Sequence, residues 1–250
     1  MKNIKGILFD KDGTLLDFNS IWVPVAEALA KEIAADLQVD KSCDLEEKLL
    51  KSIGVCCGKV EPMGILAWGT VGDIADQLKA VLHEENIKKE LLQDIEVIIE
   101  NKISRLSREK AVLVRPIGDL EKLFEKLKAL GVFIGLATSD TYESAKLCLK
   151  ILKIEEYFDF IGADDGISKS KPNPELLNKF CMACHIKPEE VAVVGDTEVD
   201  IELAANGNAA LAIAVLSGAS GIDTISQQAD FILASVHEII DGNGRFVWCE

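Results

Sequence analysis

The sequence predicts an α/β fold: a doubly wound, mainly parallel, Rossmann-like sheet with an all-helical domain inserted into it. Three features of the chain lead to this class. Short continuous apolar runs end in polar residues, helical periodicity alternates with these runs from about residue 110 onward, and a long helical block follows the first run. Continuous apolar strands suit a parallel sheet buried on both faces, and alternation with helices is typical of doubly wound domains.

The predicted strands are the apolar runs themselves. They cover residues 4–9, 132–137, 158–161, 191–194 and 211–215, with a shorter sixth run at 230–233. Polar residues stand at or just beyond the ends of the first five runs, at Asp10, Thr138, Asp164, Asp196 and Ser217. In parallel sheets of this kind, ligands bind beyond the carboxyl ends of the strands, so we expect the functional site among these polar residues.

Helices are predicted between the strands from the spacing of apolar residues. The clearest stripe recurs at intervals of three, four and three residues and consists of Leu120, Leu123, Leu127 and Leu130. Gly131 follows this stripe and is expected to end the helix. Three further segments are predicted to be helical, namely residues 140–153, 174–185 and 198–206.

A long block interrupts this alternation directly after the first strand and its loop. It carries two helical stripes, one of Trp22, Ala26, Leu29, Ile33 and Leu37 and one of Leu91, Ile95, Ile98 or Ile99, Ile103 and Leu106. The block is predicted to be helical apart from the glycine-containing stretch 54–72. We therefore expect two domains, a core of residues 1–17 and 109–250 and a helical insert of residues 18–108.

The balance of charge narrows the classes of partner. The chain has 42 acidic and 27 basic side chains and a formal net charge of -15. It therefore lacks the broad basic footprint that nucleic acids or anionic membranes require. A phosphorylated substrate is also repelled at long range, so an anion site must be built locally from a metal ion, a few lysines or backbone N–H groups.

Compartment and assembly are read from simple features of the chain. The first apolar run is brief and ends in aspartates, which does not fit a secretory signal peptide. No stretch approaches membrane-spanning length without charges. The seven cysteines have no framework spacing and are expected to be reduced thiols, which favours a cytoplasmic location. The sequence leaves a monomer and a homodimer equally open.

One cysteine cluster has the C-x-x-C-H pattern of covalent haem attachment. It consists of Cys181, Cys184 and His185 within the predicted helix 174–185. We interpret the two cysteines as small apolar residues of that helix, because no export signal accompanies them. A zinc site is also disfavoured, since no second ligand pair stands at a suitable spacing.

The segment Phe9-Asp10-Lys11-Asp12-Gly13-Thr14-Leu15 carries the strongest chemical signal. Two carboxylates at the end of a strand indicate a metal ion, a proton shuttle, or both. Gly13 allows the chain to leave the strand in a tight turn. Lys11 stands between the two aspartates, where an apolar residue is more usual, and the sequence offers no reason for it.

This segment resembles motif I of the haloacid dehalogenase superfamily. The other motifs follow in the family's order: Thr138 after Ile134-Gly135-Leu136-Ala137 resembles motif II, Lys171 before Pro172 resembles motif III, and residues 195–200 resemble the G-D-x-x-x-D form of motif IV. A helical insert directly after motif I is similar to the C1 cap of phosphoglycolate phosphatase-like members. The four ordered motifs span residues 7–200, so the resemblance covers nearly the whole chain.

The resemblance implies distinct roles for the aspartates. Asp10 is expected to be the nucleophile that forms an aspartyl-phosphate. Asp12 is expected to protonate the leaving oxygen and then to activate water against the intermediate. Asp10, the backbone carbonyl of Asp12 and Asp196 are expected to hold Mg²⁺, a hard cation that prefers oxygen ligands.

The resemblance also implies how the phosphoryl group is held. Thr138 is expected to donate its hydroxyl to a phosphoryl oxygen, with Ser139 as a further substrate contact, although either residue could instead cap the next helix. Lys171, preferred over Lys169 because a proline follows it, is expected to supply positive charge. Asp200 is expected to orient Lys171 or the water shell of the metal, or simply to favour the first turn of a helix.

The substrate implied by the resemblance is a small phosphorylated metabolite. Lys59 and Trp68, in the stretch 53–70, are candidates to contact it, although packing within the cap explains Trp68 equally well. A Mg²⁺-dependent phosphatase is the first reading. A β-phosphoglucomutase-like phosphomutase and a non-catalytic binding or regulatory protein on the same fold are the alternatives. A dehalogenase is disfavoured, because halide chemistry does not need the acid at position 12.

Overall fold

A computed structural model describes residues 3–37, 44–61, 63–85, 87, 92–218, 225 and 228–249. The chain divides into two compact units, a core unit of Met1–Asp17 with Val114–Glu250 and an inserted unit of Phe18–Leu113. The inserted unit ends at Leu113, where the sequence pattern suggested residue 108. Each unit is described by itself.

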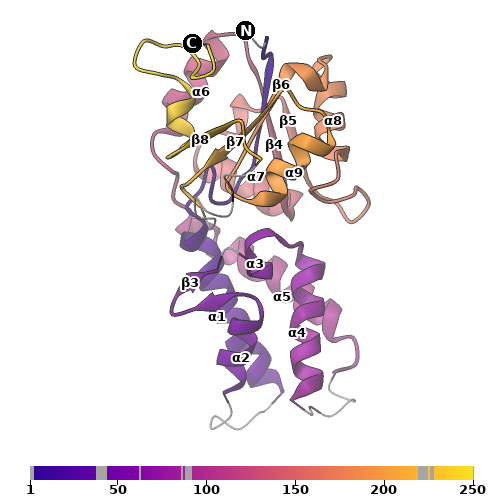
Figure 1. Cartoon of the computed structure of the whole chain (residues 1–250). Helices are drawn as coiled ribbons and strands as arrows, with labels where there is room; N and C mark the ends of the chain where they lie inside the picture. The colour runs from indigo at the N-terminus through magenta and orange to yellow at the C-terminus, as the bar shows by residue number, and fades with distance from the viewer. Residues whose placement is uncertain are drawn as a thin grey trace. The chain divides into compact units, whose positions relative to one another are not determined.

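The core unit is built on a sheet of six strands in the order β5-β4-β1-β6-β7-β8 (Figure 1). The strands are β1 Gly6–Phe9, β4 Phe133–Thr141, β5 Phe160–Asp164, β6 Val191–Gly195, β7 Leu211–Val215 and β8 Phe231–Leu233. Every neighbouring pair is parallel. This confirms the predicted doubly wound sheet.

Strand β1 occupies the centre of the sheet, where the strand order reverses. Strands β4 and β5 extend the sheet on one side of β1, and β6, β7 and β8 extend it on the other. All four residues of β1 are buried, as a strand covered on both faces requires. In open α/β sheets, ligands bind at the carboxyl ends of the strands next to such a reversal. Asp10 lies at this position, as the first residue of the loop after β1.

Helices cover both faces of this sheet (Figure 1). They are α6 Leu120–Ala129, α7 Tyr142–Ile151, α8 Glu175–Cys184 and α9 Glu198–Asn206. Leu8 packs into a core cluster with Phe180 of α8 and Ile201 of α9. The next residue, Phe9, points to the opposite face and meets Phe124 of α6 edge-on, with ring centroids 5.8 Å apart. Successive residues of one strand therefore anchor two layers of helices.

Strand β4 is longer than its apolar run predicted. It extends to Thr141, and its pairing with β5 shifts in register between Ala137 and Thr141. Polar side chains at 138–140 interrupt the apolar pattern, so the sequence indicated a strand end where the backbone continues. This extension carries Thr138, Ser139 and Asp140 at the edge where the site lies.

Local sequence explains where two of the helices end. Gly131 has a φ of +75°, and Val132 N–H donates to Leu127 O at 3.1 Å, which closes α6 as predicted. Leu130 is 48% exposed and does not belong to the buried stripe of that helix. In α8, Cys181 and Cys184 are buried in the core cluster, as their interpretation as apolar helix residues requires.

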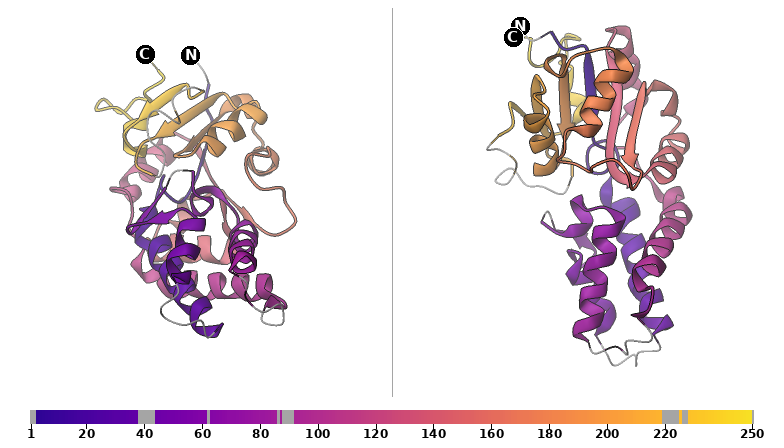
Figure 2. Two further views of the ribbon diagram at one scale, coloured as in Figure 1. Left: turned by 60° about the horizontal axis from the view of Figure 1, so that its bottom comes forward. Right: turned by 90° about the vertical axis from the view of Figure 1, so that its right-hand side faces the viewer.

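In its described residues, the inserted unit contains a bundle of four longer helices and a small hairpin. The helices are α1 Phe18–Asp36, α2 Leu45–Ser52, α4 Val71–Glu84 and α5 Ile95–Lys110, and they pack side by side (Figure 2). All five residues of the predicted α1 stripe are buried. Of the two alternatives in the second predicted stripe, Ile99 of α5 is buried and Ile98 is 41% exposed. Leu91, the first member of that stripe, lies outside the described residues.

The stretch that was not predicted to be helical forms a hairpin and one short helix. Strands β2 Val55–Cys56 and β3 Lys59–Val60 pair antiparallel, and α3 Ile65–Trp68 follows. Gly54 and Gly64 let two backbone segments touch, because a Cβ on Gly54 would lie 2.3 Å from the Cα of Gly64. No helix among the described residues is long and apolar enough to cross a membrane.

Candidate active site

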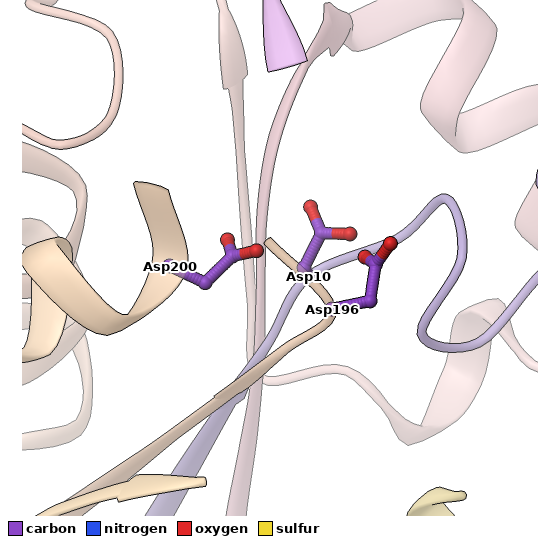
Figure 3. Close-up of side chains that lie close together, drawn as sticks. All are labelled: Asp10, Asp196 and Asp200. Carbon is purple, nitrogen blue, oxygen red and sulfur yellow. The ribbon is translucent and has the colours of Figure 1, made fainter. Parts of the chain in front are cut away.

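Three aspartates gather at the carboxyl edge of the sheet in the core unit. Asp10 follows β1, Asp196 follows β6, and Asp200 lies in the first turn of α9. One carboxylate oxygen from each residue lies within 4.8 Å of the others (Figure 3). All three side chains are buried. We call these three residues the carboxylate cluster.

Backbone pairing brings Asp10 and Asp196 together. Phe9 is in register with Val194, and Asp10 N–H donates to Val194 O at 2.8 Å. Asp196 follows two residues later, so both carboxylates emerge beside each other where β1 and β6 end. The apolar runs that predicted these strands therefore also determine which acidic residues meet.

Glycines leave the space that the Asp196 carboxylate fills. Gly13 has a φ of +86°, and a Cβ there would lie 2.3 Å from Asp196 Oδ2. A Cβ on Gly218, after β7, would lie 1.9 Å from the same oxygen. Thr14 Oγ1 donates to Asp196 Oδ1 at 3.2 Å, and Ser217 Oγ donates to Gly13 O at 2.8 Å. The loops after β1 and β7 thus enclose Asp196.

Lys171 joins two members of the cluster. Its Nζ lies 2.6 Å from Asp10 Oδ1 and 2.6 Å from Asp200 Oδ1. Burial alone would lower the pKa of Lys171, but the charges of Asp10 and Asp200 raise it above its ordinary value. Lys169, the alternative in the sequence, is exposed. The structure therefore brings Lys171, and not Lys169, into the cluster.

Asp200 uses its two oxygens in different ways. Oδ1 accepts from Lys171, whereas Oδ2 accepts from Thr197 N–H at 3.2 Å and from Thr197 Oγ1 at 2.8 Å. The second set is a capping box at the start of α9. Asp200 thus both orients Lys171 and stabilises a helix terminus, so the two readings of this residue from the sequence are compatible.

Burial changes the acidity of Asp10. Loss of hydration raises the pKa of Asp10 from its ordinary 3.8 to about 7. The positive charge of Lys171 opposes this rise, and the negative charges of Asp200 and Asp12 add to it. The charged form of Asp10, which a nucleophile or a metal ligand needs, is thus disfavoured mainly by burial and further by the neighbouring carboxylates.

The cluster fits a divalent hard cation. Its three members offer carboxylate oxygens only, the donor type that Mg²⁺ prefers. Three carboxylates against the single ammonium of Lys171 leave two uncompensated negative charges, which a divalent cation matches. Asp10 and Asp196, both expected as ligands, belong to this group, and Asp200 joins them as a third carboxylate. For Asp12 the expected ligand was the backbone carbonyl, and its side chain points to another partner.

That partner of Asp12 is Lys11. Lys11 Nζ lies 2.9 Å from Asp12 Oδ2 and 2.5 Å from Asp140 Oδ2. Lys11 is only 1% exposed, and Asp140 is also buried. Burial alone would lower the pKa of Lys11, but the charges of Asp12 and Asp140 raise it above its ordinary range. Lys11, Asp12 and Asp140 form a second charged group beside the cluster, which we call the lysine network.

Thr138 does not cap the helix that follows β4. The N-cap of α7 is Thr141, whose hydroxyl accepts from Ser144 N–H at 3.4 Å. The Thr138 hydroxyl instead accepts from Asp140 N–H at 3.1 Å and is buried. Because its oxygen is used as an acceptor, its proton can be donated to another group. Ser139 is half-buried beside it.

The two candidates in the inserted unit lie on its surface. Lys59 is exposed in β3, and Trp68, the last residue of α3, is 41% exposed. Their contact with a substrate stays a prediction.

Sequence reasoning missed Asp140, Thr14 and Gly218 as parts of the site, whereas Ser217 was among the polar strand-end residues where the site was expected. A signal existed for one of them. A lysine at the end of a buried strand needs a carboxylate partner, so Lys11 indicated that an acidic residue at a neighbouring strand end would face it. Thr14 acts through one hydroxyl contact and Gly218 through the space it leaves, and neither has a comparable signal.

Comparisons with known proteins give one family match and several relatives. The sequence model of the haloacid dehalogenase-like hydrolases matches residues 4–208. A phosphoglycolate phosphatase from Aquifex aeolicus strain VF5 is 27% identical over 234 residues, which cover 94% of each chain. The pyrophosphatase PpaX of Halalkalibacterium halodurans is 34% identical over 131 residues, 52% of this chain and 60% of that protein.

Solved structures share the fold. A predicted phosphoglycolate phosphatase from Haemophilus somnus 129PT superposes with a TM-score of 0.72 at 18% identity, covering 96% of this chain and 97% of that one. A β-phosphoglucomutase from Clostridium difficile has a TM-score of 0.64 at 19% identity, covering 93% and 91%. At these identities the likeness concerns the fold alone. The family match spans most of the chain, and the protein is a member of the haloacid dehalogenase-like hydrolases.

Proposed function

We propose that the protein is a Mg²⁺-dependent phosphatase that hydrolyses a small phosphate monoester through an aspartyl-phosphate. The observation that carries the proposal is the buried Asp10, ion-paired to Lys171 and grouped with Asp196 and Asp200 at the end of the central strand. A 27% identical phosphoglycolate phosphatase that aligns over 94% of both chains supports the same chemistry.

The first half-reaction is attack by Asp10 on the phosphorus atom. A new bond joins an Asp10 carboxylate oxygen to phosphorus while the bond to the ester oxygen breaks, and the alcohol leaves with a proton. In the second half-reaction, water attacks the phosphorus, which releases inorganic phosphate and restores the Asp10 carboxylate. No oxidant or reductant takes part.

Lys171 and Thr138 stabilise the transferring group. Charge spreads over the phosphoryl oxygens in the transition state, so positioning and positive charge are the main catalytic terms. Lys171 is held by Asp200 as well as by Asp10, which fixes the ammonium beside the nucleophile. The Thr138 hydroxyl accepts from Asp140 N–H, so its own proton is available to a phosphoryl oxygen.

Asp12 handles the proton. It gives a proton to the leaving ester oxygen and takes one from the attacking water in the second half-reaction. Its carboxylate lies on Lys11 Nζ at 2.9 Å, which keeps it near the end of β1.

Mg²⁺ would be held by Asp10, Asp196 and the backbone carbonyl of Asp12, with Asp200 beside them. When bound, it supplies positive charge that offsets repulsion between the nucleophile and the phosphate. A cation at this position also favours the ionised form of Asp10, whose pKa burial raises to about 7.

The proposal is tested by phosphate release from a panel of phosphate esters and pyrophosphate, with and without Mg²⁺. The panel begins with phosphoglycolate and pyrophosphate, because relatives are named for these substrates, and includes hexose phosphates. We expect release of inorganic phosphate that requires Mg²⁺ and is lost in Asp10→Asn. Glu125→Gln, which changes an exposed acid on α6, is the matched control and should stay active.

The outcomes separate the alternatives. A phosphomutase would convert a hexose phosphate into its isomer with little release of inorganic phosphate. A binding protein would bind Mg²⁺ and phosphate esters and hydrolyse none of the panel. Either outcome, or a fully active Asp10→Asn variant, would refute the proposed function.

A further inference from the structure

We propose that Lys11 is a positioning residue, which together with Asp140 holds the side chain of Asp12 where its acid form can protonate the leaving oxygen and its carboxylate can later accept a proton from water. The proposal rests on the phosphatase function argued above. It gives a role to the residue between the two motif aspartates, which the sequence left without explanation.

Lys11 links Asp12 to a second carboxylate that is itself held by a backbone N–H group. Lys11 Nζ contacts Asp12 Oδ2 at 2.9 Å and Asp140 Oδ2 at 2.5 Å. The other oxygen of Asp140 accepts from Thr141 N–H at 2.7 Å, so Asp140 is itself anchored to the backbone of β4. Asp12 lies at the other end, in the loop that leaves β1. The ammonium therefore ties the acid of one strand end to the backbone of its neighbour.

A purely structural role explains this arrangement poorly. Removing a lysine and a carboxylate from water is costly, and an apolar side chain of similar size stabilises a protein interior as well or better. An apolar side chain between Asp10 and Asp12 could fill the same volume, but it could not hold a carboxylate in one orientation. The charged pair therefore contributes orientation rather than net stability.

A third titratable group also lies near Lys11. Besides the two carboxylates, the titratable group that faces Lys11 is the thiol of Cys148 on α7, and burial raises the pKa of that thiol to about 11. Cys148 is thus neutral at physiological pH and brings no negative charge to the ammonium, whose ion pairs with Asp12 and Asp140 carry the argument.

The network also reaches the predicted phosphate-binding residue. Asp140 donates its backbone N–H to Thr138 Oγ1 at 3.1 Å, while its side chain accepts from Lys11. Asp12, Lys11, Asp140 and Thr138 thus form one continuous chain of polar contacts. Through it, the proton donor and the group expected to bind the phosphoryl oxygen keep a fixed relation to each other.

The leaving group provides the test. An alkoxide leaves only with a proton, so an alkyl phosphate needs the acid, whereas 2,4-dinitrophenolate leaves without one. The value of kcat/KM reports the steps up to loss of the alcohol, so the later hydrolysis of the intermediate does not enter. We would compare kcat/KM for the best alkyl phosphate of the panel with that for 2,4-dinitrophenyl phosphate in Lys11→Met, Asp140→Asn and the double variant.

We expect Lys11→Met to lower kcat/KM for the alkyl phosphate about 10- to 100-fold, which is part of the roughly 10²- to 10⁴-fold that general acids contribute. For the aryl phosphate, kcat/KM should change less than about threefold. The double variant should show the same selective loss, because both changes break one chain of contacts. Cys148→Ala is the matched control: it removes buried atoms beside Lys11 but keeps the charges, so it should lower the melting temperature and preserve the ratio of the two esters.

Equal losses for the two esters would overturn the proposal, as would a similar change of ratio in Cys148→Ala. If Lys11→Met does not fold, the double variant, which removes the Asp140 carboxylate together with the ammonium, carries the comparison. Failure of all three variants to fold would show a structural role instead and would also overturn the proposal. Failure of the phosphatase function is distinguishable, because the unmodified protein would then hydrolyse neither ester.

Discussion

Gly218→Ala should weaken Mg²⁺ binding without straining the backbone. The backbone at Gly218 does not lie in the left-handed region, so an alanine adopts it without strain. Its new Cβ, however, would lie 1.9 Å from Asp196 Oδ2 and 2.2 Å from Asp196 Cγ. Ordinary contact begins near 3.4 Å, so the carboxylate must retreat by about 1.5 Å.

The size of the effect follows from this displacement. Mg²⁺ demands near-ideal octahedral geometry at short distances, and misplacement by about 1 Å can cost roughly 100-fold in rate. We expect the Kd of Mg²⁺ to rise about 10- to 100-fold, which is about 1.4–2.8 kcal/mol. Phosphate release at limiting Mg²⁺ should fall by a similar factor and recover partly at high Mg²⁺.

Isothermal titration with Mg²⁺ measures the change directly. Gly242→Ala is the control, because a Cβ there meets no atom within 4 Å. A second readout is the rise in melting temperature on addition of Mg²⁺, which depends on the ratio of its concentration to Kd. An unchanged Kd in Gly218→Ala would refute the placement of Asp196 among the metal ligands.

Three further predictions follow from the same geometry. Mg²⁺ should bind more weakly as the pH falls below about 7, because Asp10, with its pKa raised to about 7, must lose a proton to bind it. The raised pKa also means that the folded, metal-free protein binds this proton more tightly than the unfolded chain does. Urea titrations of the metal-free protein should therefore show that the contribution of Asp10 to the unfolding free energy is lost as the pH rises from about 4 to about 7. Lys171→Met should lower kcat/KM about 100-fold or more, whereas Lys169→Met, two residues earlier and exposed, should leave it unchanged in the same assay. Phe124→Ala, fully buried against Phe9, should lower the unfolding free energy by about 3–5 kcal/mol, and Phe133→Ala, at 36% exposed, by much less.

The sheet was predictable from the sequence because its strands are buried on both faces. The run 211–215 matches β7 residue for residue, and the runs before Asp10 and Asp196 end where β1 and β6 end to within one residue. Where polar residues continue a strand, as at 138–141 in β4, the apolar pattern ends too early. Burial patterns report which side chains avoid water, and they do not report how far the backbone stays extended.

Pairing among charged side chains was less predictable. The motif resemblance indicated Asp10, Lys171, Asp196 and Asp200, and the structure brings them together. The motif resemblance did not indicate that Asp140 faces Lys11, since the two residues are 129 positions apart and only the β1–β4 register makes them neighbours. Contacts of this kind depend on distances of a few ångströms between strand ends, which spacing along a chain cannot supply.

The central claim is that Asp10 becomes phosphorylated. Rapid acid quenching of the protein during turnover of an alkyl phosphate, followed by borohydride reduction, converts an acyl phosphate of aspartate into homoserine, which peptide mass spectrometry locates. We predict homoserine at position 10 when both the ester and Mg²⁺ are present, and none when either is absent or in Asp10→Asn. Reduction at a different aspartate, or at none while phosphate is still released, would contradict the account.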